Sequence, residues 1–302
     1  MDKLNKVINT TKSLIDLPYN QMNLDNFDDV LFKNNYQIRF LETPDNLPIK
    51  LMSGNHCNSG IITNKSCTEL EYNTKKRRIF IVGKGILFDS GGMDLKPRKM
   101  CDMTDDKAGM IIALSVANYL KGNIVAYCPC TTNFIQTSKI IPGDEIKIGK
   151  KIVKITNTDA EGRLILAEAL TTLKPNKDDI IITIATLTGA VGYAIGDKAT
   201  GVFTENEELA KKYLEATSEA KEYAWRLPLW DYLQKNYYNK KLIKNSVEEI
   251  KEGATEGAMF IKQFVPFPNN WIHLDIAYSA FTKKKANGVP IKSLINFIKK
   301  LQ

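Results

Sequence analysis

The chain has 302 residues, of which 43% are hydrophobic and 25% are charged. This composition is typical of a globular protein and excludes a disordered chain, a collagen-like fibre and a low-complexity array. The formal net charge is +8, but the basic residues lie in short dispersed runs (75–78, 283–285 and 299–300), which favours a solvated surface over a nucleic-acid interface. No apolar run approaches the roughly 18–20 residues that span a bilayer, and the N-terminus lacks the apolar stretch of a signal peptide. We therefore expect a cytoplasmic protein that does not bind membranes.

Helices and strands alternate in the first half of the chain. An N-terminal helix is indicated by apolar residues at Val7, Leu14 and Ile15. The elements predicted after it are, in chain order, a helix at 27–33, strands at 36–41 and 79–82, a helix at 106–120 and a strand at 123–128.

The second half continues the alternation. Its predicted elements are a strand at 151–155, a helix at 161–173, a strand at 179–185, helices at 206–220 and 227–236, a strand at 271–276 and a helix at 289–301. The run at 179–185 (DIIITIA) is continuously apolar, as in strands buried within a parallel sheet. The pattern predicts an α/β fold, a three-layer sandwich with a largely parallel central sheet flanked by helices. No internal repeat, linker or charge block divides the chain, so we expect a single domain over residues 1–302.

Two residue counts restrict the chemistry. The five cysteines include no C-x-x-C pair, so neither a zinc ribbon nor a redox dithiol is indicated. The only histidines are His56 and His273, which excludes a His-rich metal site, and no G-x-S-x-G motif supports a serine hydrolase. Carboxylates, Lys and Arg must therefore carry any metal or acid–base chemistry.

Polar residues gather where predicted strands end, which is where open α/β sheets place ligands. The segment 83–92 holds Lys84 and Asp89 among four glycines. A glycine turn with incidental polar residues is the plainer interpretation, and the segment does not match a phosphate loop. Further along, Lys96 precedes a carboxylate pair at 105–106 that opens an apolar helix, where helix capping would also explain the carboxylates.

A third polar cluster, residues 157–164, has the sequence NTDAEGRL. Thr158 and Glu161 have the spacing of a capping box. However, Asp159 and Glu161 lie within one turn and repel each other unless a cation or an arginine lies between them. Gly162 also weakens the start of a helix unless a neighbour must approach the backbone closely. Lysines and carboxylates at several strand ends favour hard divalent cations bound by oxygen ligands.

Residues 157–164 resemble the signature of the leucyl aminopeptidase (cytosol aminopeptidase) family, the M17 metallopeptidases. Further segments resemble this family in order and spacing: VGKGILFDSGG at 82–92, ATLTGA at 185–190, ATGVFT at 199–204, WRLPL at 225–229 and HLDIA at 273–277. The resemblance covers nearly the whole chain. Because TKSLIDLPYN at 11–20 resembles the start of the family's catalytic domain, we expect the catalytic domain alone, without the usual N-terminal domain.

The resemblance implies an aminopeptidase that removes N-terminal, preferably Leu-like residues from peptides through a water activated by two divalent ions, Mn²⁺ or Zn²⁺. It implies the metal ligands Lys84, Asp89, Asp106, Asp159 and Glu161. Asp105 competes with Asp106, because the interval from Lys96 is one residue shorter than in relatives. Lys96 and Arg163 match catalytic residues, Lys96 for the oxyanion and Arg163 for a bicarbonate that acts as the general base.

The resemblance also implies a substrate pocket and an assembly. The residues implied to line the pocket are Met103, Thr186, Gly189, Ala277 and Ala280. The expected partners are peptides with a free N-terminus and further copies of the chain, in a homo-oligomer that is a hexamer in the family. Two alternatives stay open: a two-metal phosphoesterase, which the NTDAEGRL register disfavours, and a basic nucleic-acid-binding module, whose salt-dependent binding to DNA would survive mutation of Asp159.

Overall fold

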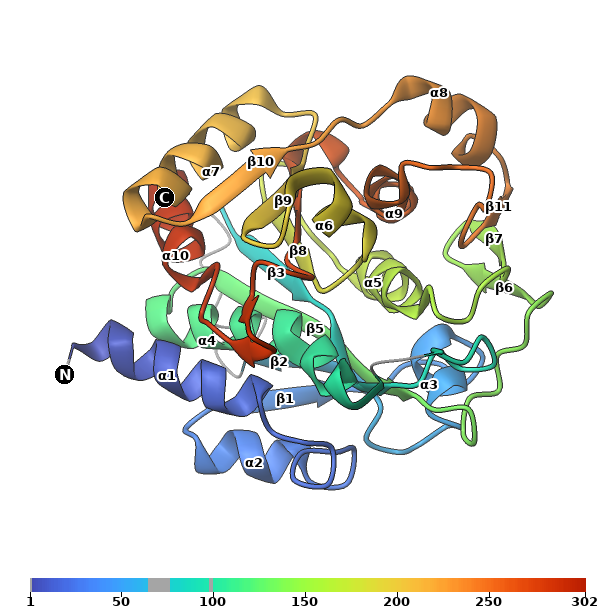
Figure 1. The fold of residues 1–302 in the computed structure, drawn as a ribbon, viewed down its shortest axis with the longest axis horizontal. Helices are drawn as coiled ribbons and strands as arrows, with labels where there is room; N and C mark the ends of the chain where they lie inside the picture. Colours follow the sequence, from blue (N-terminus) through green and yellow to red (C-terminus); the bar gives the residue numbers. More distant parts are fainter. Residues whose placement is uncertain (1, 65–76, 98–99) are drawn as a thin grey trace.

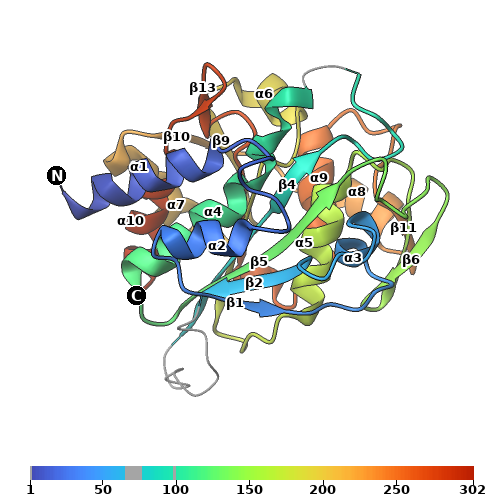
Figure 2. The ribbon, with the colours of Figure 1, turned by 90° about the horizontal axis from the view of Figure 1, so that it is seen from below.

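The computed structural model describes residues 2–64, 77–97 and 100–302; Cys67 and the two lysines at 75–76 lie outside these ranges. The described residues form a central sheet with helices on both faces (Figures 1 and 2). This confirms the predicted α/β sandwich. Within these ranges, the helices are all too short or too polar to cross a bilayer.

Nine strands build the described central sheet. They are β1 (Ile38–Leu41), β2 (Gly60–Asn64), β3 (Ile79–Gly83), β4 (Gly85–Asp89), β5 (Ile124–Asn133), β8 (Ile180–Ala185), β9 (Ala199–Phe203), β10 (Tyr223–Arg226) and β12 (Trp271–Asp275). Their order is β1-β2-β5-β3-β8-β12-β9-β10, with β4 paired to β5. The strands β5, β3, β8 and β12 at the centre are parallel, whereas β1, β2 and β9 each run antiparallel to a neighbour. The sheet is therefore mostly parallel, as predicted.

Two helical layers cover this sheet. The helices are α1 (Lys3–Ile15), α2 (Phe27–Lys33), α3 (Pro48–Met52), α4 (Ala108–Leu120), α5 (Glu161–Thr172), α6 (Ala190–Ile195), α7 (Glu207–Ala220), α8 (Asp231–Leu233), α9 (Gly253–Lys262) and α10 (Ile291–Leu301). Helices α1, α2, α4, α7 and α10 contribute to the core on one face, and α3, α5 and α9 contribute to the core on the other.

Successive side chains of the buried strands point alternately into the two hydrophobic cores, one on each face of the sheet. In β3, Ile79 and Ile81 pack in the core that contains α4, whereas Phe80 and Val82 pack in the core that contains α5. Successive side chains of a strand point to opposite faces of the sheet, so a strand covered on both faces must be apolar at every position. The continuous apolar runs in the sequence are therefore a direct consequence of the two helical layers.

Smaller elements extend this framework. A second sheet contains β6 (Glu145–Ile148), β7 (Lys151–Lys154) and β11 (Leu242–Lys244), and a hairpin is formed by β13 (Phe281–Thr282) and β14 (Lys285–Ala286). A 3₁₀ segment, η1 (Met100–Lys107), leads into α4, and a π-helical turn, η2 (Gln234–Tyr238), follows α8.

Several predicted elements differ from the structure. The strand predicted at 151–155 exists as β7, but it pairs in the small sheet and not in the central one. The helix predicted at 227–236 is reduced to α8, since the chain continues as the π-helical turn. The strand β4 lies inside the glycine-rich segment 83–92, for which we predicted no strand.

Candidate active site

Lys84 connects β3 to β4 at the centre of the sheet. Its backbone N–H donates to the carbonyl of Ile184 over 3.0 Å, and its carbonyl accepts from the N–H of Met110 over 2.8 Å. Glycines permit this close packing, because a β-carbon on Gly83 would lie 2.3 Å from the carbonyl oxygen of Gly109. The backbone of Lys84 is thus fixed between β8 and the start of α4.

The side chain of Lys84 is buried among acidic groups. Its Nζ lies 2.9 Å from Asp106 Oδ1 and 2.9 Å from Glu161 Oε1, and it donates to the carbonyl of Thr186 over 3.0 Å. Burial alone would lower the pKa of Lys84, but Asp106 and Glu161 together raise it above its ordinary value. The carboxylates around Lys84 therefore favour the protonated form of its amine.

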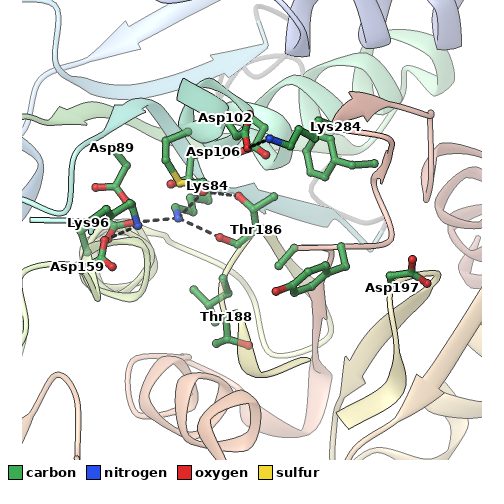
Figure 3. Close-up of a pocket in the computed structure, with 18 of the residues that line it drawn as sticks. Lys84, Asp89, Lys96, Asp102, Asp106, Asp159, Thr186, Thr188, Asp197 and Lys284 are labelled. Carbon is green, nitrogen blue, oxygen red and sulfur yellow. Dashed lines mark hydrogen bonds and ion pairs between the residues drawn. The ribbon is translucent and has the colours of Figure 1, made fainter. Parts of the chain in front are cut away.

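Asp89 and Lys96 form the second half of the cluster. Asp89 Oδ1 accepts from the backbone N–H of Gly91 over 2.8 Å and from Asn133 Nδ2 over 2.7 Å. Its other oxygen lies 2.7 Å from Nζ of Lys96, which also forms an ion pair with Asp159. Figure 3 shows Asp89, Lys96 and Asp159 together beside Lys84.

The capping-box interpretation of residues 158–161 is wrong. The N-cap of α5 is Ala160, and it forms no side-chain capping bond. The hydroxyl of Thr158 instead donates to the carbonyl of Gly91 over 2.7 Å and accepts from the N–H of Asp94 over 2.8 Å. Thr158 therefore ties two loops together, which leaves the carboxylate of Glu161 directed at Lys84.

Three carboxylates have the arrangement expected of a cation site. Oxygens of Asp89, Asp106 and Glu161 lie within 4.8 Å of one another, and all three residues are buried. Burial, reinforced by Asp89, raises the pKa of Glu161 to about 7, and burial with Asp106 raises the pKa of Asp89 to about 6. Among the described residues, Glu161 Oε2 is buried without a hydrogen-bond partner. An acceptor left unpaired in such a cluster fits a divalent cation.

The structure distinguishes the two adjacent aspartates. Asp106 Oδ1 accepts from Lys84 and, over 2.7 Å, from the hydroxyl of Thr186, so Asp106 joins the cluster. Both aspartates line the adjoining cavity, but Asp105 is not part of the cluster formed by Asp89, Asp106 and Glu161. Burial and the neighbouring Asp106 raise the pKa of Asp105 to about 8.

The cluster opens into a cavity of about 520 Å³. Of the residues expected in a substrate pocket, the cavity is lined by Met103, Thr186, Gly189 and Ala277. Ala280 is only 1% exposed and does not line it, whereas its neighbours Tyr278 and Phe281 do. The wall also contains charged residues that the predicted set lacked, namely Asp102, Asp105, Asp197, Lys283 and Lys284. Figure 3 shows Lys284 reaching Asp102, over 2.8 Å, and Asp197 apart from the carboxylate cluster.

Arg163 is the one predicted catalytic residue that is not among the cavity-lining residues of the described chain. Its guanidinium is buried, and its Nη1 lies 2.5 Å from Glu256 Oε2 on α9.

Two polar residues of the site were not predicted. Asn133, at the end of β5, bonds both Asp89 and the carbonyl of Thr158. Asp275, at the end of β12, accepts from the Thr188 hydroxyl over 2.7 Å and so positions the loop after β8. Both residues lie at the ends of strands, and this position could have indicated them as site residues. Asp275 also lies in the HLDIA segment, which resembles the family.

Comparison with known proteins places this geometry in context. Residues 9–295 match the sequence profile described as the cytosol aminopeptidase family, catalytic domain. A probable cytosol aminopeptidase of Chloroherpeton thalassium is 39% identical over 241 residues, which cover 74% of this chain and 46% of that protein. One of Chlamydia abortus is 38% identical over 242 residues, covering 74% and 48%. The chain thus spans about half the length of the curated relatives it matches.

A solved structure shares the fold. The bottromycin maturation enzyme BotP superposes with a TM-score of 0.80 at 23% identity, covering 99% of this chain and 69% of that one. A second BotP structure, in complex with Mn, gives the same score and identity and covers 70% of that chain. At this identity the match concerns the fold alone.

Proposed function

The chain belongs to the cytosol aminopeptidase family, and from this premise we propose that it is a metal-dependent aminopeptidase that removes N-terminal residues from peptides. The observation that carries the proposal is the buried cluster of Asp89, Asp106 and Glu161 at the floor of a cavity. Such a cluster combines oxygen ligands for divalent cations with space for a substrate.

The residues that would hold two divalent ions, Mn²⁺ or Zn²⁺, are Lys84, Asp89, Asp106, Asp159 and Glu161. The unpaired oxygen of Glu161 and the convergence of three carboxylates support this donor set. When bound, two such ions supply Lewis acidity and a water of lowered pKa. Lys84 coordinates a metal only as the neutral amine, so its raised pKa makes metal binding compete with its protonation.

Lys96 would act on the substrate carbonyl. Its side chain is 16% exposed, at the boundary between the carboxylates and the cavity. A fixed ammonium group in a partly water-excluded site stabilises the negative charge that develops on a carbonyl oxygen during hydrolysis. Burial lowers the pKa of Lys96, but Glu161 and Asp89 outweigh this effect and raise it, which favours a charged ammonium group that donates hydrogen bonds at neutral pH.

The carboxylates would also restrict the enzyme to free N-termini. Asp106 faces the cavity and offers an anionic acceptor to the α-ammonium group of a peptide. An acetylated N-terminus lacks this charge and could not form the charge-assisted bond to Asp106.

The first side chain of the substrate would lie against Met103, Thr186, Gly189 and Ala277. None of these is charged, so an apolar side chain such as Leu is preferred to a charged one. The ring of Tyr278 packs against Gly192 of α6, where a β-carbon would come within 2.6 Å of the ring. Tyr278 therefore supports the same wall.

We extend the proposal to a cytoplasmic location and to a homo-oligomer, a hexamer, as expected for the family. Exposed aromatic residues support an assembly: Tyr223 and Trp225 on the edge strand β10 are 68% and 65% exposed. Neighbouring exposed aromatic groups on an edge strand favour contact with a partner. Light scattering that finds a fully active monomer would contradict this part.

Chelation tests the proposal as a whole. The protein should hydrolyse leucine amide, lose this activity on treatment with a chelator and regain it with Mn²⁺ or Zn²⁺. Full activity in metal-free protein would refute the metal-dependent reaction, and inactivity at every metal loading would refute the aminopeptidase assignment.

A further inference from the structure

Arg163, for which the resemblance implies a bound bicarbonate, already has an anion. Its Nη1 donates to Glu256 Oε2 over 2.5 Å and to the backbone carbonyl of Asn245 over 2.8 Å. The side chains of Arg163 and Glu256 are only 8% and 5% exposed. An arginine and a carboxylate buried together form a neutral pair that is strongly coupled, because little water screens their charges.

Glu256 is itself held in place. Its other carboxylate oxygen, Oε1, accepts from the hydroxyl of Tyr238 over 3.0 Å, and Tyr238 is fully buried. The backbone of Glu256 lies in α9, which packs directly against α5, the helix of Arg163 (Figure 1). The Glu256 carboxylate is therefore held in place by its helix, α9, and by the Tyr238 hydroxyl. Unlike a bicarbonate ion, it does not have to bind from solution.

The residues present do not fit a bicarbonate ion at Arg163. Glu256 neutralises the charge of the guanidinium, and a bicarbonate ion would compete for that charge with a tethered carboxylate at a high effective concentration. An anion that displaced Glu256 from Nη1 would leave a buried carboxylate without a cationic partner, which is costly.

We propose that Glu256 is a built-in counter-anion of Arg163, a positioning residue that excludes bicarbonate and makes this site independent of it. Because Arg163 also bonds Asn245, the ion pair between Arg163 and Glu256 helps to position the loop before α5. The Asn245 side chain accepts from the backbone N–H of Thr156 over 2.7 Å and donates to the carbonyl of Asn157 over 2.7 Å. The ion pair thus anchors the start of α5 to the loop that presents Asp159.

Equilibrium titration with sodium bicarbonate tests the assignment. Binding is measured by calorimetry at fixed ionic strength against sodium chloride, on both the chelated and the zinc-loaded protein. The parent protein should show no saturable bicarbonate site. Glu256→Gln keeps the shape of the side chain but leaves the Arg163 charge uncompensated, and it should acquire a saturable bicarbonate site about tenfold or more tighter than the upper limit set by the parent.

Glu252→Gln is the matched control. Glu252 precedes α9 and is exposed, and its side chain bonds Tyr232 and not Arg163. This variant removes a carboxylate from the same region, so it should bind bicarbonate no better than the parent. A saturable bicarbonate site in the parent overturns the proposal, and so does a folded Glu256→Gln variant whose affinity is unchanged. If Glu256→Gln fails to fold, the titration of the parent alone decides.

The assignment of Glu256 rests on the proposed aminopeptidase function only where it concerns the effect of bicarbonate on kcat. If the protein is an aminopeptidase, its kcat in carbonate-free buffer should equal that with added bicarbonate, and Glu256→Gln should acquire a bicarbonate-dependent kcat. A parent enzyme stimulated by bicarbonate would contradict this inference and leave the aminopeptidase assignment intact. The binding titration needs no activity, so a protein without peptidase activity still tests Glu256.

Discussion

The side chain of Lys84 passes directly over the backbone of Gly162. A β-carbon at position 162 would lie 2.7 Å from Cε of Lys84 and 2.9 Å from its Nζ. Glycine in a helix costs about 1 kcal/mol relative to alanine, so a glycine in the first turn of α5 needs a physical reason. The sequence indicated a close backbone approach at Gly162, and the structure identifies Lys84 as the group that approaches.

Gly162→Ala should separate helix stability from metal binding. The new methyl group meets only the flexible end of Lys84, so the fold should survive, but the amine should move away from Asp106 and Glu161. We expect the metal affinity, measured by calorimetry, to fall about tenfold, as for other changes that reorient a ligand. Thr171→Ala, on an exposed position of α5, is the control for helix propensity and should leave the affinity unchanged. Equal affinities in the two variants would show that Lys84 is not a ligand.

Lys96→Ala should lower kcat by roughly 10²–10³, the usual cost of losing an oxyanion donor. Bound metal, measured by elemental analysis, should be unchanged, since Lys96 is not among the expected ligands. Lys283→Ala makes the same chemical change elsewhere in the cavity wall and should lower kcat far less. A Lys96→Ala enzyme with the parent kcat would remove Lys96 from the mechanism.

Glu161→Gln should reduce the affinity for both metal ions, because a neutral amide replaces the carboxylate that faces the cluster. Glu168→Gln is a close control in the same helix. Glu168 is also buried, and burial raises its pKa to about 8, so the neutral acid resembles glutamine at pH 7. Elemental analysis after dialysis should find metal lost from the first variant and retained in the second. Stoichiometric metal in Glu161→Gln would refute its role as a ligand.

His273 should make the protein sensitive to acid. Burial lowers its pKa to about 3, and its Nδ1 lies 2.9 Å from the Thr183 hydroxyl, which also accepts from Trp271. The unfolded chain binds this proton below about pH 6.5, whereas the folded chain does so only near pH 3. Stability is therefore lost as the pH falls through this window, by about 2 kcal/mol at pH 5.

Urea unfolding at pH 8 and pH 5 measures this loss. Other buried acids titrate over the same range, so the comparison is between the parent and His273→Phe. The difference in unfolding free energy between the two pH values should be smaller in the variant by about 2 kcal/mol. Identical pH dependence in both proteins would show that His273 is not buried in its neutral form.

The specificity of the cavity should follow apolar size. Each buried methylene contributes about 0.8 kcal/mol, so leucine and methionine amides should exceed alanine amide by roughly one to two orders of magnitude in kcat/KM. Aspartyl and lysyl amides should be poorer than leucine amide. If either exceeds leucine amide, the charged wall residues, such as Asp197 and Lys283, face the first side chain, and the assignment to Met103 and Gly189 is wrong.

The sequence predicted the central strands well because both helical layers force them to be apolar throughout, as in β3 and β8. It did not predict β9 or β10, since Ala199–Phe203 and Tyr223–Arg226 are short and carry small or amphipathic residues that have no clear period. It also missed α9, whose sequence GATEGAMFIK begins with residues of low helix propensity. Packing against α5 stabilises that helix, and such long-range contacts are not visible in a local pattern.

The site residues also fall into two groups, those that lie in recognisable sequence segments and those that depend on long-range contacts. Lys84, Asp89 and Glu161 could be proposed from the sequence because each lies in a segment that resembles the family, at 82–92 or 157–164. Glu256 was not, because its significance depends on meeting Arg163 across 93 positions of sequence. A single sequence does not reveal that an expected anion site is already filled by a carboxylate of the same chain.

The most direct test of the central claim is a mass-spectrometric time course on two peptides of one sequence beginning with Leu, one with a free N-terminus and one acetylated. The metal-loaded protein should shorten the free peptide one residue at a time from its N-terminus, leave the acetylated peptide intact and do neither after chelation. Cleavage of the acetylated peptide at a comparable rate, or cleavage at internal bonds, would contradict the account.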